Sequence, residues 1–391
     1  MKNKVTIGLE NLIADPPEFL KGKRLGLLSN PASVDRSFHH ASRLIHESFP
    51  GQLKALFSPQ HGFYAEKQDN MIESDHFSEP ELNIPVYSLY NDTRTPTKEM
   101  FDQIDVLLVD IQDVGTRVYT FIYTVSFCLE AAAKLDKQVV ILDRPNPIGG
   151  TQVEGNILLK EFASFVGRFP IPMRHGMTIG EILHFFNREF HIGCDLTIIP
   201  MTGWKRDLYW QDTQLPWIAP SPNLPTPQSC MVYPGQVIFE GTNISEGRGT
   251  TLPFEQFGAP FLDTVKIKAK ADKIIKGACL RLVNFEPTSG KWQGNVCKGF
   301  QIHITSVEEF KPYLSSLILM QLIIRYHKDE FEFTPPPYEY EFEKMPIDLI
   351  LGSQSLRKKL TNLEDLVYLS DQWSGELENF KSLSRKYYLY E

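Results

Sequence analysis

Four short apolar runs in the first 145 residues constrain the fold more than any other feature of the sequence. Each run has the length of a strand and carries Leu, Val or Ile at successive positions, which is typical of strands covered on both faces of a parallel sheet. Helix-like segments separate the runs at residues 37–47, 97–101 and 119–134. The alternation predicts an open, doubly wound, mostly parallel α/β sheet. The four runs are 24–29, 53–58, 105–110 and 138–143, and a weaker one covers 85–89.

The pattern changes towards the C-terminus, and 391 residues favour two domains over one. A capped helix from Thr178 and a strand near 195–201 continue the first pattern, and a proline-rich loop follows at 215–227. Beyond it we expect a helix at 266–277, strands at 281–285 and 300–305, a helix after the cap at 306–309 and two helices from Ser355 onward. We therefore predict a larger α/β domain over residues 1–262 and a smaller α+β domain over 263–391.

Composition excludes several classes of function. A net charge of −8 and a pI near 5.8 argue against nucleic-acid binding, and no apolar run reaches the length of a membrane helix. The five scattered cysteines form no CxxC pair, so we expect no zinc site and a reducing compartment. The first residues do not resemble a secretory signal, which points to the cytoplasm.

Motifs for cofactors and metals are also missing from the sequence. No nucleotide-binding glycine motif, HExxH or GxSxG occurs, so we expect no cofactor and no metal. The oligomeric state stays open.

Polar residues follow each apolar run, where the carboxyl ends of parallel strands meet at one edge of a sheet. Hydrated loops explain one such case, but four in succession, rich in Asp, Arg, His and Asn, favour a ligand site. The candidates taken from these ends are Gln60, His61, Asp110, Asp113, Arg117, Asp143, Arg144 and Asn146.

Two further segments carry chemistry. In residues 233–250, glycines accompany Glu240, Asn243, Glu246 and Arg248, a combination that suits sugar recognition, with Glu240 as a candidate acid. The alternative, that these charges only pair with one another, has equal support. In the other segment, Arg174 and His175 precede the helix capped by Thr178, where a helix N-terminus attracts anions.

Taken together, the chain resembles the NamZ-type exo-β-N-acetylmuramidase family. The resemblance rests on long motifs: SPQHGFYAEKQDN (58–70), VYSLYNDTRTPTKEM (86–100), DIQDVGTRVYTFIYT (110–124), LDRPNPIGG (142–150), ASFVGRFPIPMRHGMTIGEI (163–182), PSPNLPT (220–226) and EGTNISEGRGTTLPFEQFGAPF (240–261).

The resemblance implies a Rossmann-like larger domain, an active site between the two domains, and release of terminal N-acetylmuramic acid from peptidoglycan fragments. The substrate would be a small glycan or muropeptide. On this hypothesis Asp110 or Asp113 acts as one carboxylate and Glu240 or Glu246 as the other, and the anomeric outcome stays open. Tyr119 and Asn223 lie within the shared motifs and join the binding candidates.

Position 60 departs from the family, which usually has Pro-Glu-His-Gly where this chain has Pro-Gln-His-Gly. A glutamine cannot exchange a proton as an acid–base catalyst. Either another carboxylate acts, or the substrate's acetamido group is the nucleophile, or hydrolysis has given way to a related sugar or to binding alone. An unrelated α/β hydrolase or transferase is a weaker alternative. If another carboxylate acts, the candidates are Glu66, Asp69, Asp110, Asp113 and Glu240.

Overall fold

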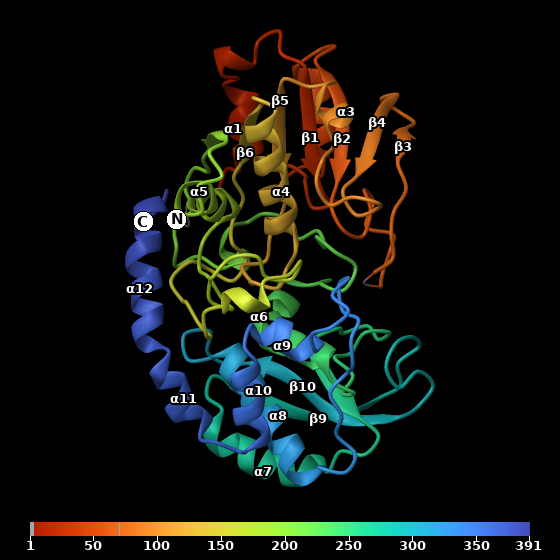
Figure 1. The fold of residues 1–391 in the computed structure, drawn as a ribbon, viewed down its shortest axis with the longest axis vertical. Helices are drawn as coiled ribbons and strands as arrows, with labels where there is room; N and C mark the ends of the chain where they lie inside the picture. Colours follow the sequence, from red (N-terminus) through yellow and green to blue (C-terminus); the bar gives the residue numbers. More distant parts are fainter. Residues whose placement is uncertain (1–3, 70) are drawn as a thin grey trace.

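The computed structural model describes residues 4–69 and 71–391, and its larger unit is built on a seven-stranded sheet (Figure 1). The strands lie in the order β3-β4-β2-β1-β5-β6-β7, and all neighbours are parallel except β3 and β4. The predicted open, mostly parallel sheet is confirmed. The strands are β1 Leu25–Ser29, β2 Leu53–Ser58, β3 Phe77–Glu79, β4 Ile84–Ser88, β5 Val106–Asp110, β6 Gln138–Leu142 and β7 Asp195–Ile199.

Helices cover both faces of this sheet. α1 and α2 pack on one face, and α4 and α5 pack on the other. The side chains of strand β5 alternate between the two faces. Val106 and Leu108 belong to the hydrophobic core beneath α1 and α2, and Leu107 and Val109 belong to the core beneath α4 and α5. The helices of this unit are α1 Gly8–Ala14, α2 Ala41–Ser48, α3 Lys98–Phe101, α4 Phe121–Lys134 and α5 Ile179–Glu189.

The smaller unit holds a three-stranded antiparallel sheet in the order β8-β10-β9. Its helix α8 is buried along most of its length and packs against α6, α7, α10 and α11. The strands are β8 Gln256–Ala259, β9 Ala278–Phe285 and β10 Cys297–Ile304. The helices are α6 Pro227–Gln236, α7 Thr264–Ile274, α8 Pro312–Tyr326, α9 Pro346–Leu351, α10 Gln354–Thr361, α11 Leu366–Gln372 and α12 Ser374–Ser384.

Three details differ from the sequence-based expectations. β8 precedes residue 262 yet pairs with β10, so the second sheet draws on a segment that we had assigned to the first domain. The helix expected after the cap at 306–309 begins only at Pro312. The two helices expected from Ser355 are three, α10, α11 and α12.

The two units are joined by a buried cation and by the end of the chain. Arg117 donates to the carbonyls of Asn156 and Ile171 in the larger unit at 2.8 and 3.1 Å. It also donates to Ile350 and Leu351, the last residues of α9, at 3.0 Å each. The negative end of the α9 dipole thus faces the guanidinium.

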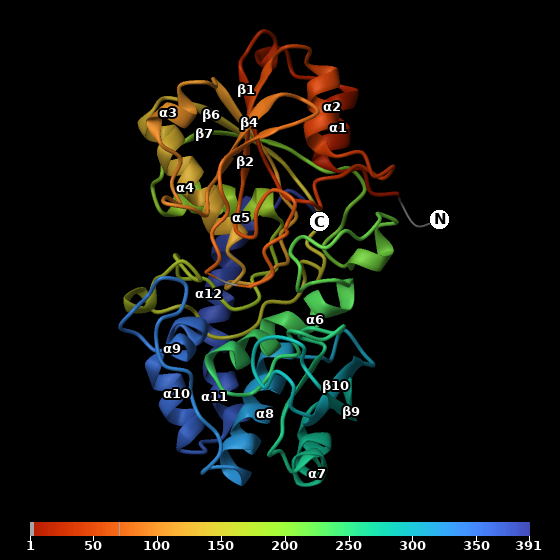
Figure 2. The same ribbon diagram turned by 90° about the vertical axis from the view of Figure 1, so that its right-hand side faces the viewer.

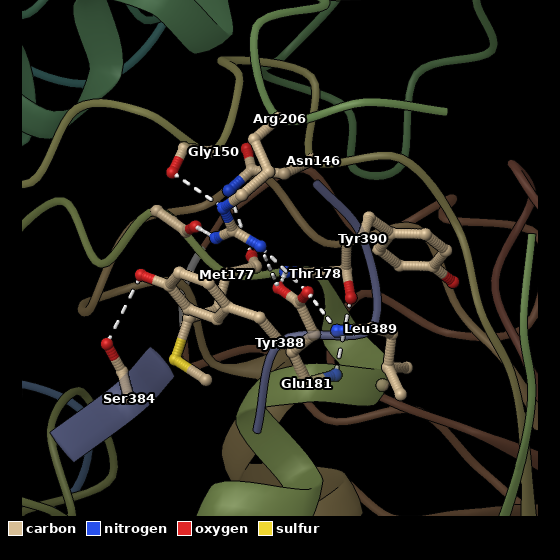
Figure 3. A network of polar contacts seen from close by, with 12 residues as sticks. Asn146, Gly150, Met177, Thr178, Glu181, Arg206, Ser384, Tyr388, Leu389 and Tyr390 are labelled. Atoms are coloured by element: carbon tan, nitrogen blue, oxygen red, sulfur yellow. Dashed lines mark hydrogen bonds and ion pairs between the residues drawn. The ribbon is translucent and has the colours of Figure 1, made fainter. Parts of the chain in front are cut away.

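α12 carries the chain from the smaller unit back to the larger one, and its end lies beside α5 (Figures 1 and 2). The final residues are bound tightly there (Figure 3). Arg206 forms an ion pair with Glu181 at 2.8 Å and lies 3.4 Å from the centre of the Tyr388 ring. The Leu389 amide donates to Glu181 at 2.9 Å, and the Tyr390 hydroxyl donates to Asp143 at 2.6 Å.

Within the described residues, 4–69 and 71–391, no helix is long and apolar enough to cross a lipid bilayer.

Candidate active site

A cavity of about 450 Å³, open solvent included, lies where segments from both units meet. Gln60 and His61 reach it from the end of β2, and Tyr338 and Glu339 reach it from the segment before α9. The full lining is Gln60, His61, Val118, Tyr119, Thr120, Phe121, Val166, Ser221, Asn223, Leu224, Tyr233, Glu240, Arg248, Phe254, Tyr338 and Glu339. The cavity therefore brings two glutamates, an arginine, a histidine and several tyrosines together.

Glu339 is held by a network of buried polar groups. Its Oε2 accepts from the Tyr90 hydroxyl at 2.6 Å, and its Oε1 accepts from Gln60 Nε2 at 3.0 Å. Gln60 Oε1 in turn accepts from the Thr120 hydroxyl at 2.8 Å, which fixes the amide. Burial raises the pKa of Glu339 above its ordinary value, although the Tyr90 and Gln60 hydrogen bonds act in the opposite direction. Nearby Glu240 adds to the rise in this pKa.

Glu240, on the 3₁₀ turn Val237–Gly241, is held in a different way. Its Oε1 pairs with Arg248 at 2.8 Å, and its Oε2 accepts from the Tyr338 hydroxyl at 2.5 Å. Arg248 also contacts Glu246 at 3.3 Å, and Lys291 binds Glu246 at 2.8 Å. Burial opposes ionisation of Glu246, but Lys291 and Arg248 outweigh it and hold its pKa below the ordinary value.

His61 contributes a neutral ring to the cavity. Its Nδ1 lies 2.7 Å from the carbonyl oxygen of Lys67, so Nδ1 carries the proton and Nε2 is left as an acceptor. Burial, reinforced by Arg248, lowers the pKa of His61 to about 4. The backbone φ of 77° holds this residue in the left-handed region at the turn that follows β2.

Six of the predicted site residues line the cavity: Gln60, His61, Tyr119, Asn223, Glu240 and Arg248. Glu246 does not line it but contacts Arg248 at 3.3 Å. None of the predicted aspartates lies in the lining. Asn223 spans from the cavity to the loop after β2, since its Nδ2 donates to the Gln68 carbonyl at 2.9 Å.

The aspartates that follow β5 lie outside the described lining. Asp110 is fully buried and forms a two-pronged ion pair with Arg144, with distances of 2.5 and 2.7 Å. Asp113 accepts from the Gly115 amide at 2.8 Å and lies 3.7 Å from His175. Because neither side chain lines the cavity, we do not propose Asp110 or Asp113 as catalysts.

The remaining binding candidates also have internal partners. Asp143 accepts from Thr178 and Gly180 at 2.8 Å each and from Tyr390. Arg174 donates to Gln152 at 2.5 Å and to the Ile148 carbonyl.

The amides Asn146 and Asn243, like Arg117, serve the main chain. Asn146 donates to the Met177 carbonyl at 2.9 Å, and Asn243 donates to the Glu330 carbonyl at 2.7 Å. The smaller unit covers the sheet edge where we expected a ligand, and the polar residues of that edge pair with one another or with the covering segments.

Sequence reasoning missed Glu339, Tyr338, Tyr90, Thr120 and Tyr233. The first two follow three consecutive prolines in the segment TPPPYEYEFE, which no strand or helix pattern singles out. A run that alternates Tyr and Glu after prolines was the one available signal.

A polar groove adjoins the cavity and shares Asn223 with it. The groove encloses about 1440 Å³, open solvent included, and hydroxyl and amide side chains predominate in its wall. They include Gln68, Thr250, Thr251, Gln256, Thr288 and Ser289. In the described part of the chain no group of three or more His, Cys, Asp or Glu side chains is placed to hold a metal ion.

Paired glutamates in a cavity between a parallel α/β sheet and a smaller unit define a glycoside hydrolase. Comparison with known proteins gives the family. The chain belongs to the exo-β-N-acetylmuramidase NamZ family, whose N-terminal model matches residues 25–228 and whose C-terminal model matches residues 231–390.

The similar proteins agree with this assignment. The peptidoglycan β-N-acetylmuramidase NamZ of Bacillus subtilis is 40% identical over 390 residues, which is 100% of this chain and 92% of that protein. Crystal structures of two DUF1343 family proteins from Bacteroides fragilis are also similar. One has a TM-score of 0.88 at 33% identity and covers 99% of both chains. The other has a TM-score of 0.77 at 29% identity and covers 100% of this chain and 99% of its own.

Proposed function

We propose that this protein is an exo-acting hydrolase that releases terminal N-acetylmuramic acid from peptidoglycan fragments. The observation that carries the proposal is the cavity itself, in which Glu240 and Glu339 lie on segments from different parts of the chain. The cavity is lined by carboxyl, guanidinium, amide and tyrosine groups, which suit the hydroxyl and acidic groups of a terminal sugar. The wider polar groove beside it suits the rest of the glycan.

Arg248 is the group that we propose for recognition of the lactyl carboxylate. Arg117 and Arg174 do not line the cavity, and His61, which does, is neutral at ordinary pH. Arg248 lines the cavity, where it pairs with Glu240 and Glu246, and Lys291 binds Glu246 as well. A guanidinium can bind a planar carboxylate through two parallel hydrogen bonds.

The test is an assay of sugar release from the disaccharide N-acetylmuramyl-N-acetylglucosamine and from 4-nitrophenyl N-acetylmuramide. We expect N-acetylmuramic acid as the product of both reactions. The matched 4-nitrophenyl N-acetylglucosaminide, which lacks the lactyl group, should turn over far more slowly. Equal rates on the two chromogenic substrates would contradict recognition of the acid, and no release from any of the three would refute the function.

The glutamine at position 60 favours a second candidate, a sugar-binding protein without turnover. Calorimetric binding of N-acetylmuramic acid together with absence of hydrolysis would support it. For the compartment we propose the cytoplasm, in keeping with five free cysteines, four of them buried.

A further inference from the structure

Gln60 cannot act as an acid, yet a carboxyl group lies against it in the cavity wall. Gln60 Nε2 and Glu339 Oε1 are 3.0 Å apart. The two residues are separated by 279 positions in the sequence, so this proximity is a product of the fold. The inference that follows rests on the proposed function.

The surroundings of Glu339 favour a carboxyl that holds its proton. The residue is 5% exposed and has no cationic partner within hydrogen-bonding distance among the described contacts. Burial without an opposing cation disfavours the charged form. Arg94, the cation that acts on it from a distance, is itself engaged over the rings of Tyr90 and Tyr340 at 4.3 and 4.1 Å.

Glu240 has the opposite surroundings. It accepts from a guanidinium and from a tyrosine hydroxyl, and both contacts stabilise a carboxylate. The cavity thus contains one glutamate without a cationic neighbour in hydrogen-bonding distance among the described residues and one glutamate paired with a guanidinium. A glycoside hydrolase needs two carboxyl groups in such unlike environments, one to give a proton and one to stay ionised.

We propose that Glu339 is the general acid of the reaction. Gln60 and Tyr90 act as positioning residues, because they hold the Glu339 carboxyl through its two oxygens. Tyr90 makes the shorter bond, to Oε2, so the transferable proton lies on Oε1.

The proton and electron balance is complete with water as co-reactant. Glu339 gives its proton to the glycosidic oxygen as the bond from that oxygen to the sugar carbon breaks, and the bonding electron pair stays with the departing oxygen. The Glu240 carboxylate stabilises the positive charge that develops on the sugar ring. Water then adds to the carbon and returns a proton to the ionised Glu339, which regenerates the acid.

Two substrates with different leaving groups distinguish a general acid from a residue that only supports the structure. A sugar hydroxyl must be protonated to leave, whereas 4-nitrophenolate leaves readily as an anion. We expect Glu339→Gln to lower kcat/KM on the disaccharide by about 10² to 10⁴-fold. The same variant should retain most of its activity on 4-nitrophenyl N-acetylmuramide, and the alkaline limb of its pH profile should disappear.

Glu343→Gln is the matched control, since it makes the same chemical change at an exposed position of the same segment. It should behave as the wild type on both substrates. Circular dichroism and a urea transition for each variant separate a folding defect from a chemical one.

The outcomes separate the two claims. If the wild type is active but Glu339→Gln is impaired equally on both substrates, or on neither, the general-acid assignment falls while the function stands. If the wild type releases no N-acetylmuramic acid from either substrate, the proposed function falls and the assignment falls with it.

Discussion

Replacement of Gln60 by glutamate creates a carboxyl pair in the cavity. In the wild type, Gln60 Nε2 donates to Glu339 Oε1 at 3.0 Å, while Thr120 donates to the other end of the amide at 2.8 Å. A glutamate at position 60 keeps the Thr120 contact but brings a second carboxyl oxygen against Glu339. Two oxygens at that separation need a proton between them.

The size of the effect follows from the geometry. Two unit charges about 4 Å apart repel by about 4 kcal/mol at the effective dielectric constant of about 20 that suits protein sites. This energy corresponds to about 3 pKa units, so the pair should keep one proton to a pH well above the range in which Glu339 ionises in the wild type. The alkaline limb of the kcat/KM profile should therefore move up by as much as about 3 pH units.

The assay is the pH dependence of kcat/KM on the disaccharide for the wild type and for Gln60→Glu. Gln293→Glu is the control, because it adds the same charge at an exposed position away from the cavity. Its profile should match that of the wild type. Superimposable profiles for Gln60→Glu and wild type would show that ionisation of Glu339 does not control the rate, and the reasoning would be refuted.

Three further predictions concern the frame of the site and the anion that it binds. Arg117→Met removes four hydrogen bonds to buried carbonyls, and only the Ile171 and Leu351 carbonyls keep a second donor, from Leu158 and Asn156. The variant should lower the free energy of unfolding by about 3–5 kcal/mol in urea titrations; a stable variant with a raised KM would instead indicate a substrate contact. Burial raises the pKa of Asp143 from 3.8 to about 7, so the folded state binds its proton more tightly than the unfolded state does. Stability should then fall as pH rises from about 4 to about 7, by at most about 4 kcal/mol, and Asp143→Asn should flatten this slope; an unchanged slope would count against a titrating Asp143. Arg248→Lys should raise KM for the disaccharide about tenfold to hundredfold, the equivalent of about 1.5–3 kcal/mol for a charged hydrogen bond, and an unaltered KM would remove Arg248 from recognition of the acid.

The sheet could be predicted from the sequence because its strands are buried on both faces. All five residues of β1 and of β5 are buried, and such strands appear in the sequence as continuous apolar runs. The strand β3 has three residues, two of them exposed, and leaves no such run. The helix α6 was missed because prolines at its first position and in its interior conceal a helical pattern.

The site was only partly predictable, for a physical reason. Polar residues at the carboxyl edge of a parallel sheet face a ligand when that edge is open. Here the smaller unit and the C-terminal residues cover much of the edge, so Asp143 meets Tyr390 and Arg117 meets Leu351. Glu240 was found because its segment combines charges with glycines, whereas the place of Glu339 depends on tertiary contacts that no local pattern encodes.

The distance along the chain between Gln60 and Glu339 also bears on when activity arises during biosynthesis. The sheet leaves the ribosome first and can form its own core, but the acid that completes the cavity is synthesised long afterwards. A nascent or prematurely terminated chain would thus possess the binding wall for a sugar without the means to cleave it. The chain would become able to hydrolyse its substrate only when the segment that carries Glu339 packs against the sheet, after almost the whole polypeptide has been made.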